Sequence, residues 1–233
     1  MGEAGKPPGA PQELFELGPR RRQGAAVAGD QREALLIPQL QEIESAFREI
    51  SREARTVADG LSHGQFNWRP GSGQWSVAEC LGHLNMMGSD PLESVDAGIR
   101  EARSRQWYSQ GPFRIGYFAD QLIRATEPPV RWKRSANHKF VPPSDQPMGL
   151  VVPAIIDLQT QLIARLGLAN GLNLARIRVA APGRLILRLN LYELFVYLAA
   201  HERRHLEQAW RVRRNRMLPK TGPARPGGTP QRS

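Results

Sequence analysis

The sequence predicts an all-α protein, a four-helix bundle, from three observations. Four stretches of the chain carry apolar residues at spacings of three and four, the repeat of a helix with one buried face. Residues typical of helix N-termini precede two of these stretches. Short apolar alternation of the strand type is confined to residues 172–188. Helices with one apolar face bury it most simply against one another, which favours a bundle.

The first predicted helix is long and amphipathic. Pro38 falls in its first turn, where the missing N–H of proline costs nothing. Gly60 and Gly64 end it. Its apolar face steps by four and three through Leu36, Leu40, Ile43, Phe47, Ile50, Ala54, Val57 and Leu61.

The second helix is predicted to begin at Ser76. Ser76 and Glu79 have the spacing of a capping box, in which each side chain bonds to the backbone N–H of the other residue. The helix then runs through Met87, and Pro91 kinks it or restarts it. Further helical character is expected to about residue 105 and again over residues 117–125.

A long Pro-rich loop is predicted between the second and third main helices. Residues 127–153 contain six prolines and no regular period. The third helix follows from about Pro153 to Leu166, with Ile155, Leu158 and Leu162 on one side. The fourth begins with Asn190 as its N-cap and continues to about Arg213.

These elements predict one folded domain with two tails. Residues 1–33 are rich in Gly, Pro and Ala and are expected to be a disordered N-terminal extension. Residues 34–213 form the helical bundle. Residues 214–233 are expected to be a disordered basic tail.

The charge and the cysteine content limit the function classes. The formal net charge is +10, but residues 211–233 supply +7 of it, so the bundle itself is nearly neutral. No base-reading motif accompanies these charges, so specific nucleic-acid binding is not expected. The single cysteine, the absence of a signal sequence and the absence of an apolar run of membrane-spanning length favour a cytoplasmic protein without a membrane segment.

Three of the five histidines point to a metal site. His201 and His205 lie four residues apart and continue the apolar stripe of Leu194 and Leu198. Side chains at this spacing share a helix face, with Cβ atoms about 5–6 Å apart. Imidazoles in core positions need partners, and one metal ion would satisfy both. His83, on the second helix, is the candidate third ligand.

Two interpretations of the histidines stay open at this point. The pair at residues 201 and 205 is equally consistent with solvated or hydrogen-bonded side chains on an Arg-rich helix, and His83 with an ordinary core position. If all three bind one ion, a coordination position remains open, which is typical of catalytic rather than structural sites. The catalytic group would then be a metal-bound water or thiol.

Two segments of the chain resemble a known family. Residues 75–84, WSVAECLGHL, are similar to the W-S-x-x-E-x-x-x-H-L segment of the DinB-like superfamily of bacterial four-helix bundles. Residues 201–208, HERRHLEQ, are similar to its H-x-x-x-H-x-x-Q segment. The two segments occur in the family's order, and the resemblance spans about residues 35–213.

The resemblance implies that His83, His201 and His205 bind a divalent ion such as zinc, nickel or iron. Relatives include thiol S-transferases, so the implied activity is transfer of a low-molecular-weight thiol to an electrophilic small-molecule substrate. A metal-dependent hydrolase and a non-catalytic metal-stabilised binding or stress-response module are the alternatives. Since relatives often pair, a homodimer is the assembly to expect if this chain follows them.

Residues around the three histidines have candidate supporting roles. Glu79 and Gln208 could orient the ligand side chains through hydrogen bonds, although the capping role already explains Glu79. Trp132 and His138 in the long loop could form a lid over the open coordination position. For His138, an ordinary exposed side chain is the simpler interpretation. His63 is expected to be exposed in a turn.

Three neighbours of the candidate ligands are expected to have ordinary roles. Cys80 is expected to be a small buried hydrophobe rather than a fourth ligand. Trp75 is expected to pack at the entry to the second helix. Glu202 points away from His201 on the helical wheel, and a surface ion pair with an arginine is expected for it.

Overall fold

The structure, a computed structural model, describes residues 35–128 and 137–220, apart from the side chains of residues 184–186. It confirms the all-α class, since helices dominate and the described residues form a single two-stranded sheet. The predicted disorder of the tails concerns mainly residues outside these ranges and stays a prediction. The helices are α1 Pro38–Ala58, α2 His63–Phe66, α3 Val77–Ser89, α4 Leu92–Ser104, α5 Tyr117–Thr126, α6 Met148–Ala169 and α7 Leu191–Arg213, with a 3₁₀ helix, η1, at His138–Phe140.

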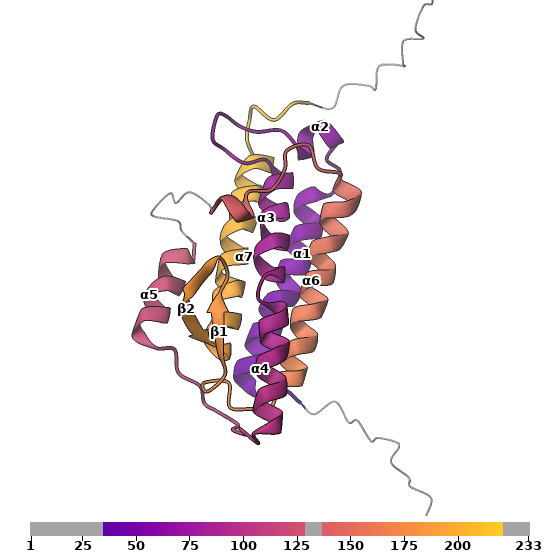
Figure 1. The fold of residues 1–233 in the computed structure, drawn as a ribbon. Helices are drawn as coiled ribbons and strands as arrows, with labels where there is room; N and C mark the ends of the chain where they lie inside the picture. Colours follow the sequence, from indigo (N-terminus) through magenta and orange to yellow (C-terminus); the bar gives the residue numbers. More distant parts are fainter. Residues whose placement is uncertain (1–34, 129–136, 221–233) are drawn as a thin grey trace, which may run out of the picture. The chain divides into compact units, whose positions relative to one another are not determined.

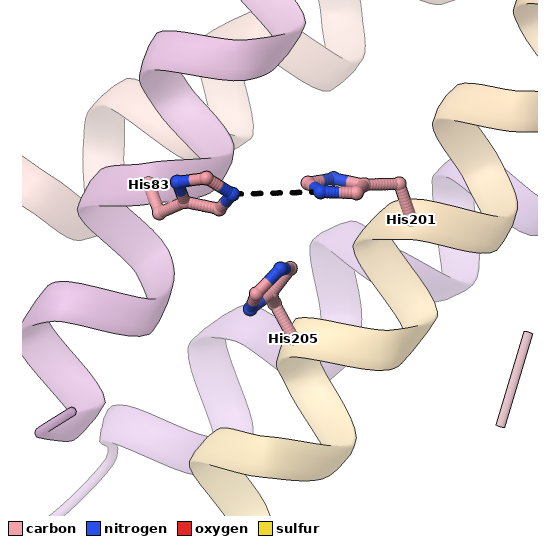
Figure 2. A group of neighbouring side chains, drawn as sticks. All are labelled: His83, His201 and His205. Atoms are coloured by element: carbon pink, nitrogen blue, oxygen red, sulfur yellow. Dashed lines mark hydrogen bonds between the residues drawn. The ribbon is translucent and has the colours of Figure 1, made fainter. Parts of the chain in front are cut away.

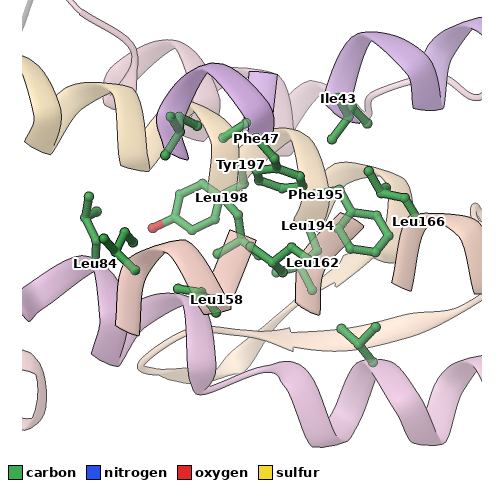
Figure 3. Packing of buried hydrophobic residues seen from close by; sticks show 14 of the residues in the cluster. Ile43, Phe47, Leu84, Leu158, Leu162, Leu166, Leu194, Phe195, Tyr197 and Leu198 are labelled. Carbon is green, nitrogen blue, oxygen red and sulfur yellow. The ribbon is translucent and has the colours of Figure 1, made fainter. Parts of the chain in front are cut away.

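Helices α1, α3, α6 and α7 pack against one another around the hydrophobic core. α1 and α3 each pack against both α6 and α7 (Figure 1). Phe47, Leu162 and Phe195 meet inside and are almost fully buried (Figure 3). The apolar face predicted for α1 is the buried one, since Leu40, Phe47 and the residues at the same spacing lie within the core. The periodicity therefore predicted which face of α1 is buried.

The helix starts follow the capping residues. The Ser76 hydroxyl accepts from the Glu79 N–H at 3.1 Å, and the Glu79 carboxylate accepts from the Ser76 N–H at 2.9 Å. Asn190 and Glu193 form the same reciprocal pair at the start of α7. Both predicted caps are confirmed, and they set where the histidine-bearing helices begin.

The third main helix begins earlier than predicted. α6 starts at Met148, directly after Pro147, and Pro153 lies inside it. Pro153 leaves the carbonyl four residues earlier, at Gly149, without its helical donor. Since both Gly149 and Pro153 are exposed, water replaces that bond at little cost. The Pro-rich loop is correspondingly shorter than predicted and contains η1.

A β-hairpin occupies part of the region where only apolar alternation was noted. β1 Arg178–Ala181 pairs antiparallel with β2 Arg184–Asn190, and Gly183 in the turn has a φ of +67°. The hairpin and α5 both lie beside α7 (Figure 1). Ile177 and Val179 are buried, so the hairpin extends the hydrophobic core.

Among the described helices, α6 alone is long and apolar enough to cross a membrane by length and composition. No apolar run of that length was expected from the sequence. Leu158, Leu162 and Leu166 on this helix are buried in the core, and core helices of globular proteins often pass the same test.

Arg213 joins the end of α7 to the end of α1. Its Nη1 donates to the carbonyls of Thr56, Val57 and Asp59 at 3.1, 2.9 and 2.6 Å. These carbonyls belong to the last turn of α1 and the residue after it, where backbone acceptors lack helical donors and a positive charge is favourable.

Replacement of Arg213 with methionine is expected to lower the free energy of unfolding by about 1–2 kcal/mol, because a charged donor to three carbonyls is lost. Urea denaturation at pH 7 measures this. Arg211→Met is the matched control. Among the described residues Arg211 pairs only with Glu207, in an exposed pair, so its loss should change stability by less than about 0.5 kcal/mol. Equal effects of the two substitutions would contradict the role of Arg213.

Candidate metal centre

Three histidines meet between α3 and α7. One ring nitrogen from each histidine lies within 4.8 Å of those of the other two, and all three residues are buried. His83 comes from α3, and His201 and His205 come from successive turns of α7 (Figure 2). The Nε2 atoms of His83 and His201 are 3.4 Å apart. The structure thus brings together the three histidines that the sequence singled out.

The local sequence explains this convergence. His201 and His205 continue the buried stripe of Leu194 and Leu198, so they face the core. His83 lies two turns after the Ser76 cap on the helix that packs against α7. The exposed fractions of His83, His201 and His205 are 4%, 8% and 9%. The alternative in which His201 and His205 are solvated side chains is therefore excluded.

Hydrogen bonds set the orientation of two of the rings. His83 Nδ1–H donates to the Phe140 carbonyl at 2.7 Å, which leaves its Nε2 without a proton. His205 Nδ1 lies 3.1 Å from Gln208 Oε1, an acceptor, so this ring also carries its proton on Nδ1. In both rings Nε2 therefore carries a lone pair that can bind a metal ion, and that of His83 faces His201 Nε2 at 3.4 Å.

Burial keeps the three imidazoles neutral. Desolvation lowers the pKa of His83 below its usual value, and it lowers the pKa of His205 much further. The pKa of His201 falls to about 3, through burial first and then through the neighbouring His83 and Arg204. Neutral imidazole is the form that binds metals, so the site needs no deprotonation at neutral pH.

The arrangement fits a divalent metal ion. Tetrahedral coordination with metal–nitrogen bonds of about 2.0–2.1 Å places ligand nitrogens about 3.3–3.4 Å apart. The separation of His83 and His201 has this value. His201 Nδ1 is a buried nitrogen with no hydrogen-bond partner among the described residues, whereas Nδ1 of His83 and Nδ1 of His205 each have one.

Trp75 and Phe140 enclose the histidines. The Trp75 ring lies 4.8 Å from the ring of His83 and 5.6 Å from that of His205, between ring centres. Trp75 therefore forms a wall of the site as well as packing at the start of α3, a role that the sequence pattern did not predict. Phe140 acts through its backbone carbonyl, and no residue-type signal could have identified it.

Glu79 and Cys80 play the ordinary roles expected of them. Arg69 and Ser76 donate to the Glu79 carboxylate. Burial alone would raise the pKa of Glu79, but these bonds lower it below the usual value. Cys80 is fully buried, lies outside the histidine group, and burial raises its thiol pKa. Neither residue contacts the centre of the three imidazoles as a ligand.

That Trp132 and His138 form a lid over the site stays a prediction. Trp132 lies outside the described residues. His138 is exposed at the start of η1, two residues before Phe140. His63 is exposed as expected, and its Nε2 lies 2.7 Å from Asp145 Oδ1.

The expectation for Glu202 is wrong. Its side chain is buried, with 2% of the residue exposed, and its Oε1 accepts from Gln159 Nε2 at 3.1 Å. Burial raises its pKa to about 8. The helical wheel correctly turned Glu202 away from His201, but α7 is packed on that side too, against α3 and α6 residues. The arginine next to it, Arg203, pairs with Glu127 instead.

Comparison with known proteins agrees with these observations. The family model described as the DinB superfamily matches residues 46–209, which include α3, α7 and all three histidines. Neither the curated proteins nor the solved structures yielded a match. The matched region covers well over half of the chain, and the chain therefore belongs to the DinB superfamily, a metal-binding superfamily.

Proposed function

We propose that this protein binds a divalent metal ion through His83, His201 and His205 and uses it to transfer a low-molecular-weight thiol to an electrophilic small molecule. The observation that carries the proposal is a buried group of three neutral imidazoles without a fourth metal-binding side chain among the described residues. Structural metal sites are usually closed by four protein ligands, whereas three leave a position for a reactant.

Each surrounding group has a role in this proposal. The Phe140 carbonyl and Gln208 orient His83 and His205. The Trp75 ring covers part of the site and excludes water from that side. The ion, when bound, would ease deprotonation of a thiol at the open position, and the thiolate is the form that attacks an electrophile.

The acidic residues near the histidines favour thiol transfer over the hydrolase alternative. Hydrolysis gains from a carboxylate that can accept a proton from the attacking water. The Glu79 carboxylate already accepts hydrogen bonds from Arg69 and Ser76, and the Glu202 carboxylate accepts one from Gln159. A thiol has a much lower pKa than water and needs such a base less.

The test is a transfer assay with 1-chloro-2,4-dinitrobenzene and a panel of low-molecular-weight thiols. The thiol sulfur forms a bond to the ring carbon, chloride leaves, and the thiol proton passes to solvent. We expect turnover by zinc- or nickel-loaded protein, none after chelation, and loss of at least about a hundredfold in His201→Ala.

Gln161→Ala is the control, since Gln161 lies on α6 outside the triad and its side chain bonds to Asp157, and it should retain full activity. Equal rates for metal-free and metal-loaded protein would contradict the proposal. Metal-dependent ester hydrolysis without any thiol requirement would replace it with the hydrolase.

A further inference from the structure

Residues 137–147, here called the covering segment, contain η1 and end where α6 begins. Its η1 part contacts α3. Phe140 in this segment supplies the carbonyl that accepts from His83 Nδ1–H. That carbonyl determines which nitrogen of His83 carries the proton and therefore which nitrogen faces His201. A backbone carbonyl can serve this purpose only where its own segment is held in place.

The far end of the covering segment is anchored through Gln146. Asn67 Nδ2 donates to the Gln146 carbonyl at 3.0 Å, and the Gln146 N–H donates to Asn67 Oδ1 at 2.8 Å. The Gln146 side chain reaches α3, where its Nε2 donates to the Ala78 carbonyl at 3.2 Å. Gln146 is thus bonded by its backbone and by its side chain.

Two prolines connect this anchor to Phe140. Pro142 and Pro143 have fixed φ angles, and each restricts the residue before it to extended conformations. Residues 141–143 therefore have few accessible conformations, which limits how far the chain can absorb a shift at Gln146 before it reaches the Phe140 carbonyl.

The absence of a side chain at Gly82 leaves room for the side-chain amide of Gln146. A Cβ atom at position 82 would lie 2.6 Å from Gln146 Oε1 and 2.8 Å from its Nε2. The amide therefore occupies the space of the side chain that precedes His83 on α3. Glycine inside a helix costs about 1 kcal/mol relative to alanine, and this contact gives a physical reason for it here.

We propose that Gln146, seated on Gly82, is a positioning residue for His83: it holds the covering segment so that the Phe140 carbonyl directs His83 Nε2 toward the other two histidines. The inference rests on the proposed metal site. The near end of the segment has other contacts, because Lys139 pairs with Asp90 at 2.6 Å and the Phe140 ring packs against Gly183. Loss of the Gln146 contact should therefore weaken the site without abolishing it.

Two variants act on this contact from opposite sides. Gln146→Ala removes the amide, and Gly82→Ala pushes it away while improving helix propensity. Gln161→Ala and Gly167→Ala are matched controls on α6: the side chain of Gln161 bonds to Asp157 on the same helix, and a Cβ at Gly167 meets nothing within 4 Å. Zinc affinity by chelator competition and the imidazole ¹⁵N shifts of His83 in metal-free protein are the two readouts.

We expect both variants to bind zinc about tenfold more weakly, as other losses of ligand-orienting contacts do. We also expect His83 to shift from the Nδ1–H form to a mixture of tautomers, with no loss of stability in Gly82→Ala. Wild-type affinity together with an unchanged His83 tautomer in both variants would overturn the inference. The tautomer of His83 is measured in metal-free protein, so it tests the role of Gln146 independently of metal binding. Failure of the wild-type protein to bind zinc would instead refute the proposed function.

Discussion

Lowering the pH from 6.5 to 5 is expected to destabilise the metal-free protein steeply. His83, His201 and His205 have folded-state pKa values below that of an unfolded histidine, about 6.5. Below pH 6.5 the unfolded chain therefore binds more protons than the folded chain, and acid favours unfolding. Each such histidine costs up to about 1.4 kcal/mol per pH unit, so three cost up to about 4 kcal/mol per unit.

Glu202 offsets part of this loss. Its folded-state pKa is raised to about 8, so it is protonated in the folded protein and ionised in the unfolded chain between pH 4.5 and 8. A fall in pH through this window therefore increases its contribution to stability by up to about 1.4 kcal/mol per unit. The net loss should be up to about 3 kcal/mol per pH unit between pH 6.5 and 5.

Urea denaturation of chelator-treated protein at several pH values measures this slope. His205→Ala should reduce the slope by about 1 kcal/mol per unit, and Glu202→Gln should steepen it. A free energy of unfolding that stays constant from pH 6.5 to 5 would show that the triad is not buried in its neutral form.

Replacement of His201 with alanine is expected to have the largest effect on metal binding. Its Nε2 lies 3.4 Å from that of His83, and its ring is within 4.7 Å of the His205 ring, between centres. Without His201, only His83 of α3 and His205 of α7 remain as ligands. Since loss of contacts that merely orient ligands costs about 10–100-fold in affinity, loss of a ligand should cost more than a hundredfold.

The helices that carry the site were predictable because their signals are local. The Ser76–Glu79 box and the Asn190–Glu193 box depend on residues three apart, and the histidines of α7 continue an apolar stripe with a fixed repeat. Such patterns depend on helix geometry alone. The approach of His83 to the pair followed from the resemblance to a family and from placing all three on buried faces.

The remaining features depend on contacts between distant parts of the chain. The Phe140 carbonyl, 57 residues from His83, is a backbone group present at every position, so no residue type marks it. The burial of Glu202 depends on Gln159 of α6, and its sequence neighbours, including Arg203, favoured the surface instead. The start of α6 was missed because two prolines, Pro147 and Pro153, each allow a helix start and only packing distinguishes them.

Elemental analysis of purified protein tests the central claim most directly. Wild-type protein and Gln161→Ala, expressed in medium with zinc and nickel and freed of loosely bound ions by gel filtration, should each carry about one divalent ion per chain. His201→Ala, prepared in the same way, should carry almost none. Equal metal content in His201→Ala and wild-type protein would show that the three buried histidines are not the metal site.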